Sequence, residues 1–188
     1  MGLGTFISAL DGSIVNTILP LITRALGSPL ASTQWVVTTY LLVVSGLLLA
    51  FGRLGDLGGH KRLCLLGFAA FALGSALCAL AGSAWGLVAS RALQALGAAL
   101  LFANGPAILT HNFPAQRGRI LGLQATMTYL GLTLGPSLGG WLAGAFGWRA
   151  VFSLNVPLGL AALVLGWQGL STTPPWPTSP LRRPHWRR

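Results

Sequence analysis

The sequence predicts an all-α integral membrane protein with six transmembrane helices. Of its 188 residues, 53% are hydrophobic and only 7% are charged, whereas a soluble domain carries about a quarter charged residues. Long apolar stretches recur between short polar breaks, and each is near the ~20 residues that a helix needs to cross a bilayer. A membrane β-barrel is disfavoured, because its strands would alternate polar and apolar residues.

The six apolar stretches define the elements in order. We expect spans near residues 3–22, 35–52, 63–82, 86–109, 120–144 and 150–169, in one domain over residues 1–170. Basic residues mark many of the breaks: Arg24 follows the first span, Arg53 the second, and Arg62, Arg119 and Arg149 precede the third, fifth and sixth. The 26 glycines of the chain cluster within the spans, which predicts closely packed helices rather than separate anchors. Residues 171–188 are rich in Pro, Trp and Arg, and we expect them to form a disordered cytoplasmic tail.

The basic residues between the spans predict the orientation in the membrane. Apart from Arg91, which lies inside the fourth span, they fall mostly on one side: Arg53, Lys61, Arg62, Arg117, Arg119, Arg182, Arg183, Arg187 and Arg188, against Arg24 and Arg149 on the other. The positive-inside rule then places both termini in the cytoplasm of a multi-pass protein of the plasma membrane. Although the net charge is +10, the cations are not gathered on one face, which argues against nucleic-acid binding.

Asp11 is one of only two acidic residues, and it lies inside the first predicted span. An ionisable side chain in the bilayer costs at least ~2.5–3.5 kcal/mol on the insertion scale, so it should face the interior of the bundle. Such a carboxylate is either a proton-binding site or a permanently paired structural group. The sequence alone leaves both interpretations open.

Arg91 is the candidate counter-charge of Asp11. It lies about four residues into the fourth span, and Gln94 follows on nearly the same helix face, which indicates a polar patch inside the bundle. The alternative is that Arg91 extends its side chain to the membrane surface. Asp11 and Arg91 occupy the first helices of two successive three-helix units, and inverted repeats would bring those helices together near the midplane.

The second acidic residue, Asp56, belongs to the short polar run 52–62 between the second and third spans. This run resembles the corresponding loop of the major facilitator superfamily, Gly-x-Leu-Ala-Asp-x-x-Gly-Arg-Lys. The matching residues are Gly52, Leu54, Asp56, Gly59 and Lys61, whereas His60 replaces the usual Arg and Gly55 the usual Ala. The resemblance implies a gating loop that contains Gly52, Asp56, Gly59, Lys61 and Arg62.

Further segments resemble the same superfamily, and in particular its proton-coupled drug exporters with fourteen spans. They are Leu10 to Pro20 in the first span, Gln34 to Leu42 at the start of the second, and Arg91 to Ala99 in the fourth. In the fifth span, Gly131, Gly135, Pro136, Gly139 and Gly140 match all fixed positions of the antiporter pattern Gly-x-x-x-Gly-Pro-x-x-Gly-Gly. On spacing alone, this pattern is equally compatible with a plain glycine packing stripe.

The resemblance implies the N-terminal half of a transporter, built from two inverted three-helix repeats. It would be a proton-coupled antiporter for multidrug efflux, with the bilayer, protons and an unknown small molecule as partners, and it would need no metal, cofactor or enzymatic chemistry. The alternatives are a truncated membrane protein without autonomous transport, a half that works as a homodimer, or a fragment whose C-terminal half is missing. Candidate cavity residues are Asn16, Gln34, Gln94, Asn104 and Gln124, although each also fits a helix-to-helix hydrogen bond.

Overall fold

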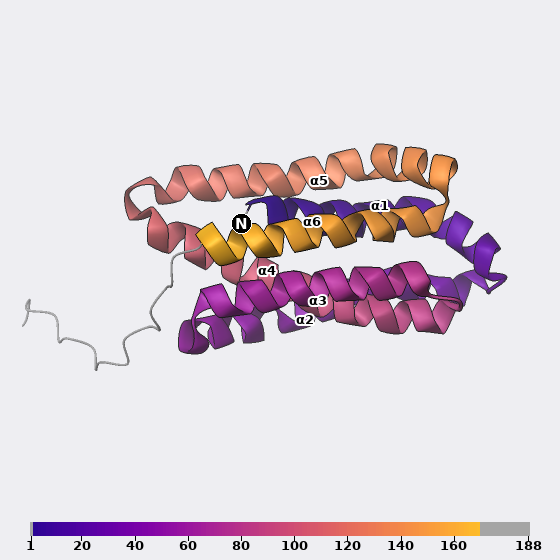
Figure 1. Ribbon diagram of the computed structural model, residues 1–188, viewed down its shortest axis with the longest axis horizontal. Coiled ribbons are helices and arrows are strands. Elements are labelled where there is room, and N and C mark those ends of the chain that lie inside the picture. Colours follow the sequence, from indigo (N-terminus) through magenta and orange to yellow (C-terminus); the bar gives the residue numbers. More distant parts are fainter. Residues whose placement is uncertain (1, 170–188) are drawn as a thin grey trace, which may run out of the picture.

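The computed structural model describes residues 2–169 as a bundle of helices that run side by side along its long axis (Figure 1). Their bounds are Gly2–Leu26 for α1, Leu30–Gly58 for α2, His60–Leu80 for α3, Ala84–Asn112 for α4, Arg117–Phe146 for α5 and Trp148–Gly169 for α6, with a short 3-10 turn η1 at Pro114–Gln116. Residues 2–169 contain six long helices and no strand, so the all-α prediction is confirmed. The predicted tail, 171–188, lies outside the described residues.

Five of these helices, all but α5, are long and apolar enough to cross a membrane. Although α5 has 30 residues, its first turn carries two arginines and its middle is rich in glycine and threonine. It nevertheless runs beside α1 along the bundle (Figure 1). Packing against α1, rather than its own hydropathy, therefore positions α5 in the bundle.

The helices of each three-helix unit pack mainly against helices of the other unit. α1 packs mainly against α5 of the second unit, and α4 packs mainly against α3 and α2 of the first, while α3 and α6 lie against each other. The first helix of each unit thus packs on the second helix of the other, as expected for inverted repeats.

The run 52–62 is not the loop that the sequence predicted. α2 continues through Gly58 and α3 begins at His60, so a single residue, Gly59, connects the two helices. Gly59 has φ +89°, a backbone conformation that residues with a side chain rarely adopt. The polar and glycine residues on either side are compatible with helix, and the reversal needs only this one glycine.

The core of the bundle is apolar, and its outer surface is apolar as well. Val15, Ile22 and Phe152 are inaccessible to solvent, whereas large side chains such as Leu49, 83% exposed, point outward. An exposed apolar surface of this kind is expected where lipid or another helix replaces water. Among the five apolar helices α2 is the most open, since only 11% of its most apolar window is buried against 56% in α1.

Candidate functional site

The buried centre of the bundle holds the ion pair that the sequence suggested. Asp11 on α1 and Arg91 on α4 are both inaccessible to solvent, and Arg91 Nη1 donates a hydrogen bond to Asp11 Oδ2 at 2.5 Å. Removing two charges from water is costly unless each is fully paired. The full burial of Arg91 also shows that its side chain does not extend to the membrane surface in this structure.

Asp11 receives two more hydrogen bonds on its other oxygen. Gln94 Nε2 donates to Asp11 Oδ1 at 3.1 Å, and Asn155 Nδ2 on α6 donates to the same atom at 2.6 Å. An ionised carboxylate only accepts hydrogen bonds, whereas a protonated one must also donate. As an ionised carboxylate, Asp11 can accept all three of these hydrogen bonds at once.

Arg91 also contacts residues on several helices. Its Nη1 donates to Gln94 Oε1 at 2.6 Å, and its Nε donates to the Val36 carbonyl at 3.4 Å. The guanidinium lies 4.2 Å from the centroid of the Tyr40 ring and 5.8 Å from that of Phe152, within the range of cation–π attraction. Arg91 thereby joins α4 to α1, α2 and α6.

Two small residues of α3 allow the network to form. At Gly74, a Cβ atom would lie 2.5 Å from the backbone nitrogen of Gln94, so only glycine lets α3 approach α4 this closely. The next residue, Ser75, accepts a hydrogen bond from Gln94 Nε2 at 2.7 Å. Neither Ser75 nor Asn155 was expected from the sequence to belong to this site. The available signal for Asn155 was that it is one of two amides, with Gln168, inside the sixth apolar stretch.

The residues of the predicted gating segment lie at the junction of α2 and α3. Asp56 Oδ1 lies 3.3 Å from His60 Nε2, and His60 Nδ1 lies 2.8 Å from Asn104 Oδ1 on α4. Asn104 is fully buried in this contact. The other members surround the turn: Gly52 lies in the last turns of α2, Gly59 forms the connection, and Lys61 and Arg62 lie in the first turn of α3.

Most glycines of the fifth-span pattern face α1. A Cβ at Gly131 would lie 2.6 Å from the Phe6 carbonyl oxygen, and at Gly135 and Gly139 it would lie 2.6 Å from side-chain carbons of Ser13 and Ile14. Ser13 Oγ also donates to the Leu132 carbonyl at 2.8 Å. Gly140, by contrast, has no atom within 4 Å of the position that a Cβ would occupy. Pro136 lies inside α5, which continues past it to Phe146.

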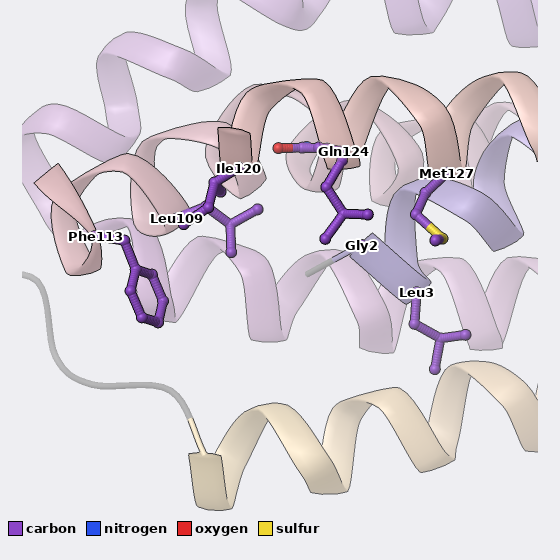
Figure 2. Close-up of a pocket in the computed structure, with 8 residues that line it drawn as sticks. Gly2, Leu3, Leu109, Phe113, Ile120, Gln124 and Met127 are labelled. Atoms are coloured by element: carbon purple, nitrogen blue, oxygen red, sulfur yellow. The ribbon is translucent and has the colours of Figure 1, made fainter. Parts of the chain in front are cut away.

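The five candidate cavity residues lie in separate surroundings. Gln94 belongs to the charged network and Asn104 to the contact with His60, whereas Asn16 and Gln34 are exposed. Gln124 lines an apolar pocket of about 340 Å³ between the ends of α1, α4 and α5 (Figure 2). Its Oε1 atom is buried without a hydrogen-bond partner. The other residues around the pocket are Gly2, Leu3, Leu109, Phe113, Ile120, Leu123 and Met127.

Comparison with protein families gives one match that covers almost the whole chain. The family model of the Major Facilitator Superfamily matches residues 1–187. The chain is 41% identical over 165 residues to the riboflavin transporter RibZ of Clostridioides difficile. It is 36% identical over 176 residues to a methylenomycin A resistance protein of Bacillus subtilis, and 38% over 166 residues to the multidrug resistance protein Stp of Mycobacterium tuberculosis.

These alignments cover 87%, 93% and 87% of the chain but only 36%, 38% and 31% of the relatives, so the chain spans about a third of their length. Solved structures show a similar fold. The POT family transporter PepTSo aligns with a TM-score of 0.76 over 95% of this chain and 39% of its own, and human MFSD10 with 0.69 over 93% and 47%, both at 19% identity.

Proposed function

Because the chain belongs to the Major Facilitator Superfamily, we propose that it is the N-terminal six-helix half of a transporter that exports small molecules in exchange for protons. Two of the relatives described above are named for resistance to an antibiotic or to multiple drugs, which supports export of small, drug-like molecules. The length of those relatives supports the view that a second half completes the transport path. In this proposal the chain lies in the plasma membrane with both termini in the cytoplasm.

The observation that carries the proposal is the buried Asp11 with its three donors. Asp11 is inaccessible to solvent and bound by Arg91, Gln94 and Asn155. It takes up a proton when α1 moves away from α4 and α6, because only then do the donors leave its oxygens. Arg91 loses its counter-charge in the same step, so protonation and helix movement are coupled. For exchange, proton and substrate must bind in a mutually exclusive manner.

In this proposal, the segment at the α2–α3 junction and the glycine motif of α5 take part in the helix movement. The segment with Gly52, Asp56, Gly59, Lys61 and Arg62 gates one end of the bundle around the single-residue connection at Gly59. The glycines of α5 allow α1 and α5 to pack closely and to shift as a pair. Polar side chains that are exposed on the bundle, Asn16 and Gln34, are available to a substrate, as is Gln124 in its pocket.

Transport in proteoliposomes tests the proposal. The purified chain is reconstituted with an imposed pH gradient, and movement of riboflavin and of a lipophilic cationic dye is followed by fluorescence. Because a second half completes the path in this proposal, we expect gradient-dependent uptake or release when the chain is reconstituted together with the C-terminal half of a relative such as RibZ, and loss of this movement in Asp11→Asn. Ser153→Ala is the matched control, since Ser153 is exposed on α6 and bonds only to its own helix, at the Arg149 carbonyl.

A second candidate function is a membrane protein without transport of its own. It is favoured by the open apolar face of α2, which in a lone half would be covered by lipid or by a second copy. If neither probe moves and Asp11→Asn behaves like the parent chain, this second function is correct. Movement that requires two copies, measured by diluting the chain with Asp11→Asn chains, would instead indicate a homodimer.

A further inference from the structure

The contact between His60, Asp56 and Asn104 restricts which nitrogens of the imidazole carry protons. The proposed export does not involve this restriction. The imidazole lies between two oxygen atoms, with Asn104 Oδ1 2.8 Å from Nδ1 and Asp56 Oδ1 3.3 Å from Nε2. Both of these oxygen atoms can only accept hydrogen bonds. Each nitrogen of the ring therefore faces an acceptor.

The orientation of the Asn104 amide is fixed by its other end. Asn104 Nδ2 donates to the Leu100 carbonyl at 3.0 Å and to the Phe51 carbonyl at 3.3 Å. Carbonyl oxygens cannot donate, so a flipped amide would place Oδ1 against two acceptors. Asn104 Oδ1 must then face the ring, and His60 Nδ1 must carry a proton to donate to it.

A neutral His60 has one proton, and Asn104 requires that proton on Nδ1. The lone pair of Nε2 is then directed at the Asp56 carboxylate, which is an unfavourable arrangement of two acceptors. A second proton, on Nε2, converts the same geometry into two donated hydrogen bonds and an ion pair. The arrangement is complete only when the ring is an imidazolium.

We propose that His60 is a proton-binding site of this bundle, separate from Asp11, and that the bound proton fastens the end of α2 to α3 and α4. The charged groups around it are Asp56 on α2, with the exposed Arg53 one turn before it, and Lys61 and Arg62 beside His60 on α3. α4 contributes the uncharged Asn104, and its next titratable residue is His111, two turns further on. The proton-dependent contact stabilises the α2–α3 junction while both ring nitrogens of His60 carry a proton.

Gly55 makes room for this site. A Cβ atom at position 55 would overlap Asn104 Oδ1 and His60 Nδ1 and would lie 2.7 Å from His60 Cε1. Gly58, in the same turn of α2, has no atom within 4 Å of its Cβ position. Glycine at position 55 thus leaves the space that both Asn104 and His60 occupy.

Nitrogen-15 NMR of histidine-labelled protein in lipid nanodiscs tests the proposal without any transport measurement, so its outcome is independent of the proposed export. The chain has three histidines, and His111→Gln with His185→Gln leaves His60 as the only signal. We expect both ring nitrogens to be protonated at low pH, and Nε2 alone to lose its proton as the pH rises. A neutral form that carries its proton on Nε2 would overturn the proposal.

Four variants sharpen the test. Asp56→Asn removes the carboxylate that faces Nε2 and should move the midpoint of the transition to lower pH. Arg53→Gln removes a cation from the same helix and should leave the midpoint unchanged or raise it. Gly55→Ala should abolish the preference for Nδ1, whereas Gly58→Ala should keep it. An unchanged midpoint in Asp56→Asn, or an unchanged tautomer in Gly55→Ala, contradicts the proposal.

Discussion

At the scale of single residues, the buried network combines a charge pair with amide donors from separate helices. Asp11 on α1 is bonded to Arg91 and Gln94 on α4 and to Asn155 on α6. Removal of Asp11 would leave the buried Arg91 without its counter-charge and Asn155 without the acceptor of its hydrogen bond. The cost of breaking such a pair therefore exceeds the stability that the intact pair contributes.

Asp11→Asn should destabilise the bundle more than the double variant Asp11→Asn with Arg91→Gln. The single change leaves the buried guanidinium of Arg91 without a counter-charge, and we expect it to lower the free energy of unfolding by about 3–5 kcal/mol. The double change removes both charges and should recover a large part of that loss. Unfolding by SDS in bicelles, followed by circular dichroism, measures both. Equal losses in the two variants would show that Arg91 is stabilised without Asp11.

Asn155→Leu should lower the free energy of unfolding by about 1–2 kcal/mol, because it removes one donor to the buried carboxylate while keeping a similar volume. Ser153→Ala, on the exposed side of α6, should change it by no more than about 0.5 kcal/mol. The same unfolding assay compares the two. A loss in Ser153→Ala as large as that in Asn155→Leu would mean that α6 is sensitive to any polar change, and that Asn155 has no special role.

At the scale of helices, the packing of α5 separates the glycines of one motif into two groups. Gly131, Gly135 and Gly139 recur every four residues. Each lies so close to α1 that a Cβ atom at its position would clash with that helix. Small residues at this spacing are typical of closely packed membrane helices. Gly140 lies on another face of the helix, so its place in the motif is not explained by contacts within residues 2–169.

Gly135→Ala and Gly140→Ala form a matched pair that tests this division. At Gly135 a methyl group would lie 2.6 Å from Ser13 Cβ and 3.2 Å from the Ile14 backbone nitrogen, so α1 and α5 must move apart. We expect a loss of about 1–3 kcal/mol in the free energy of unfolding, as for other overpacked sites. Gly140→Ala should be neutral or stabilising, since alanine favours helix. A neutral Gly135→Ala would show that the two helices separate without cost.

At the scale of the whole molecule, hydropathy predicted the helical fold because five of the six helices, all but α5, are apolar over a membrane-spanning length. The pairing of Asp11 with Arg91 could also be anticipated, since a buried charge needs a partner and few candidates exist in this chain. The contribution of Asn155 could not be anticipated, because it depends on how α6 is rotated against α1. Hydropathy also misjudged the run 52–62, where polarity suggested a loop but Gly59 alone makes the turn.

The orientation of the bundle in the membrane can be tested at the ends of its helices. Gly82, between α3 and α4, and Gly118, at the start of α5, lie at opposite ends of the bundle, and neither has an atom within 4 Å of its Cβ position. By the positive-inside rule, we expect Gly118, between Arg117 and Arg119, to lie in the cytoplasm. In intact cells, a membrane-impermeant thiol reagent should therefore label Gly82→Cys, and label Gly118→Cys only after permeabilisation.

The native Cys64 and Cys78 are buried, so the parent chain serves as the unlabelled control. Labelling of Gly118→Cys in intact cells, with protection of Gly82→Cys, would invert the bundle and place the Asp56–His60 junction outside the cell.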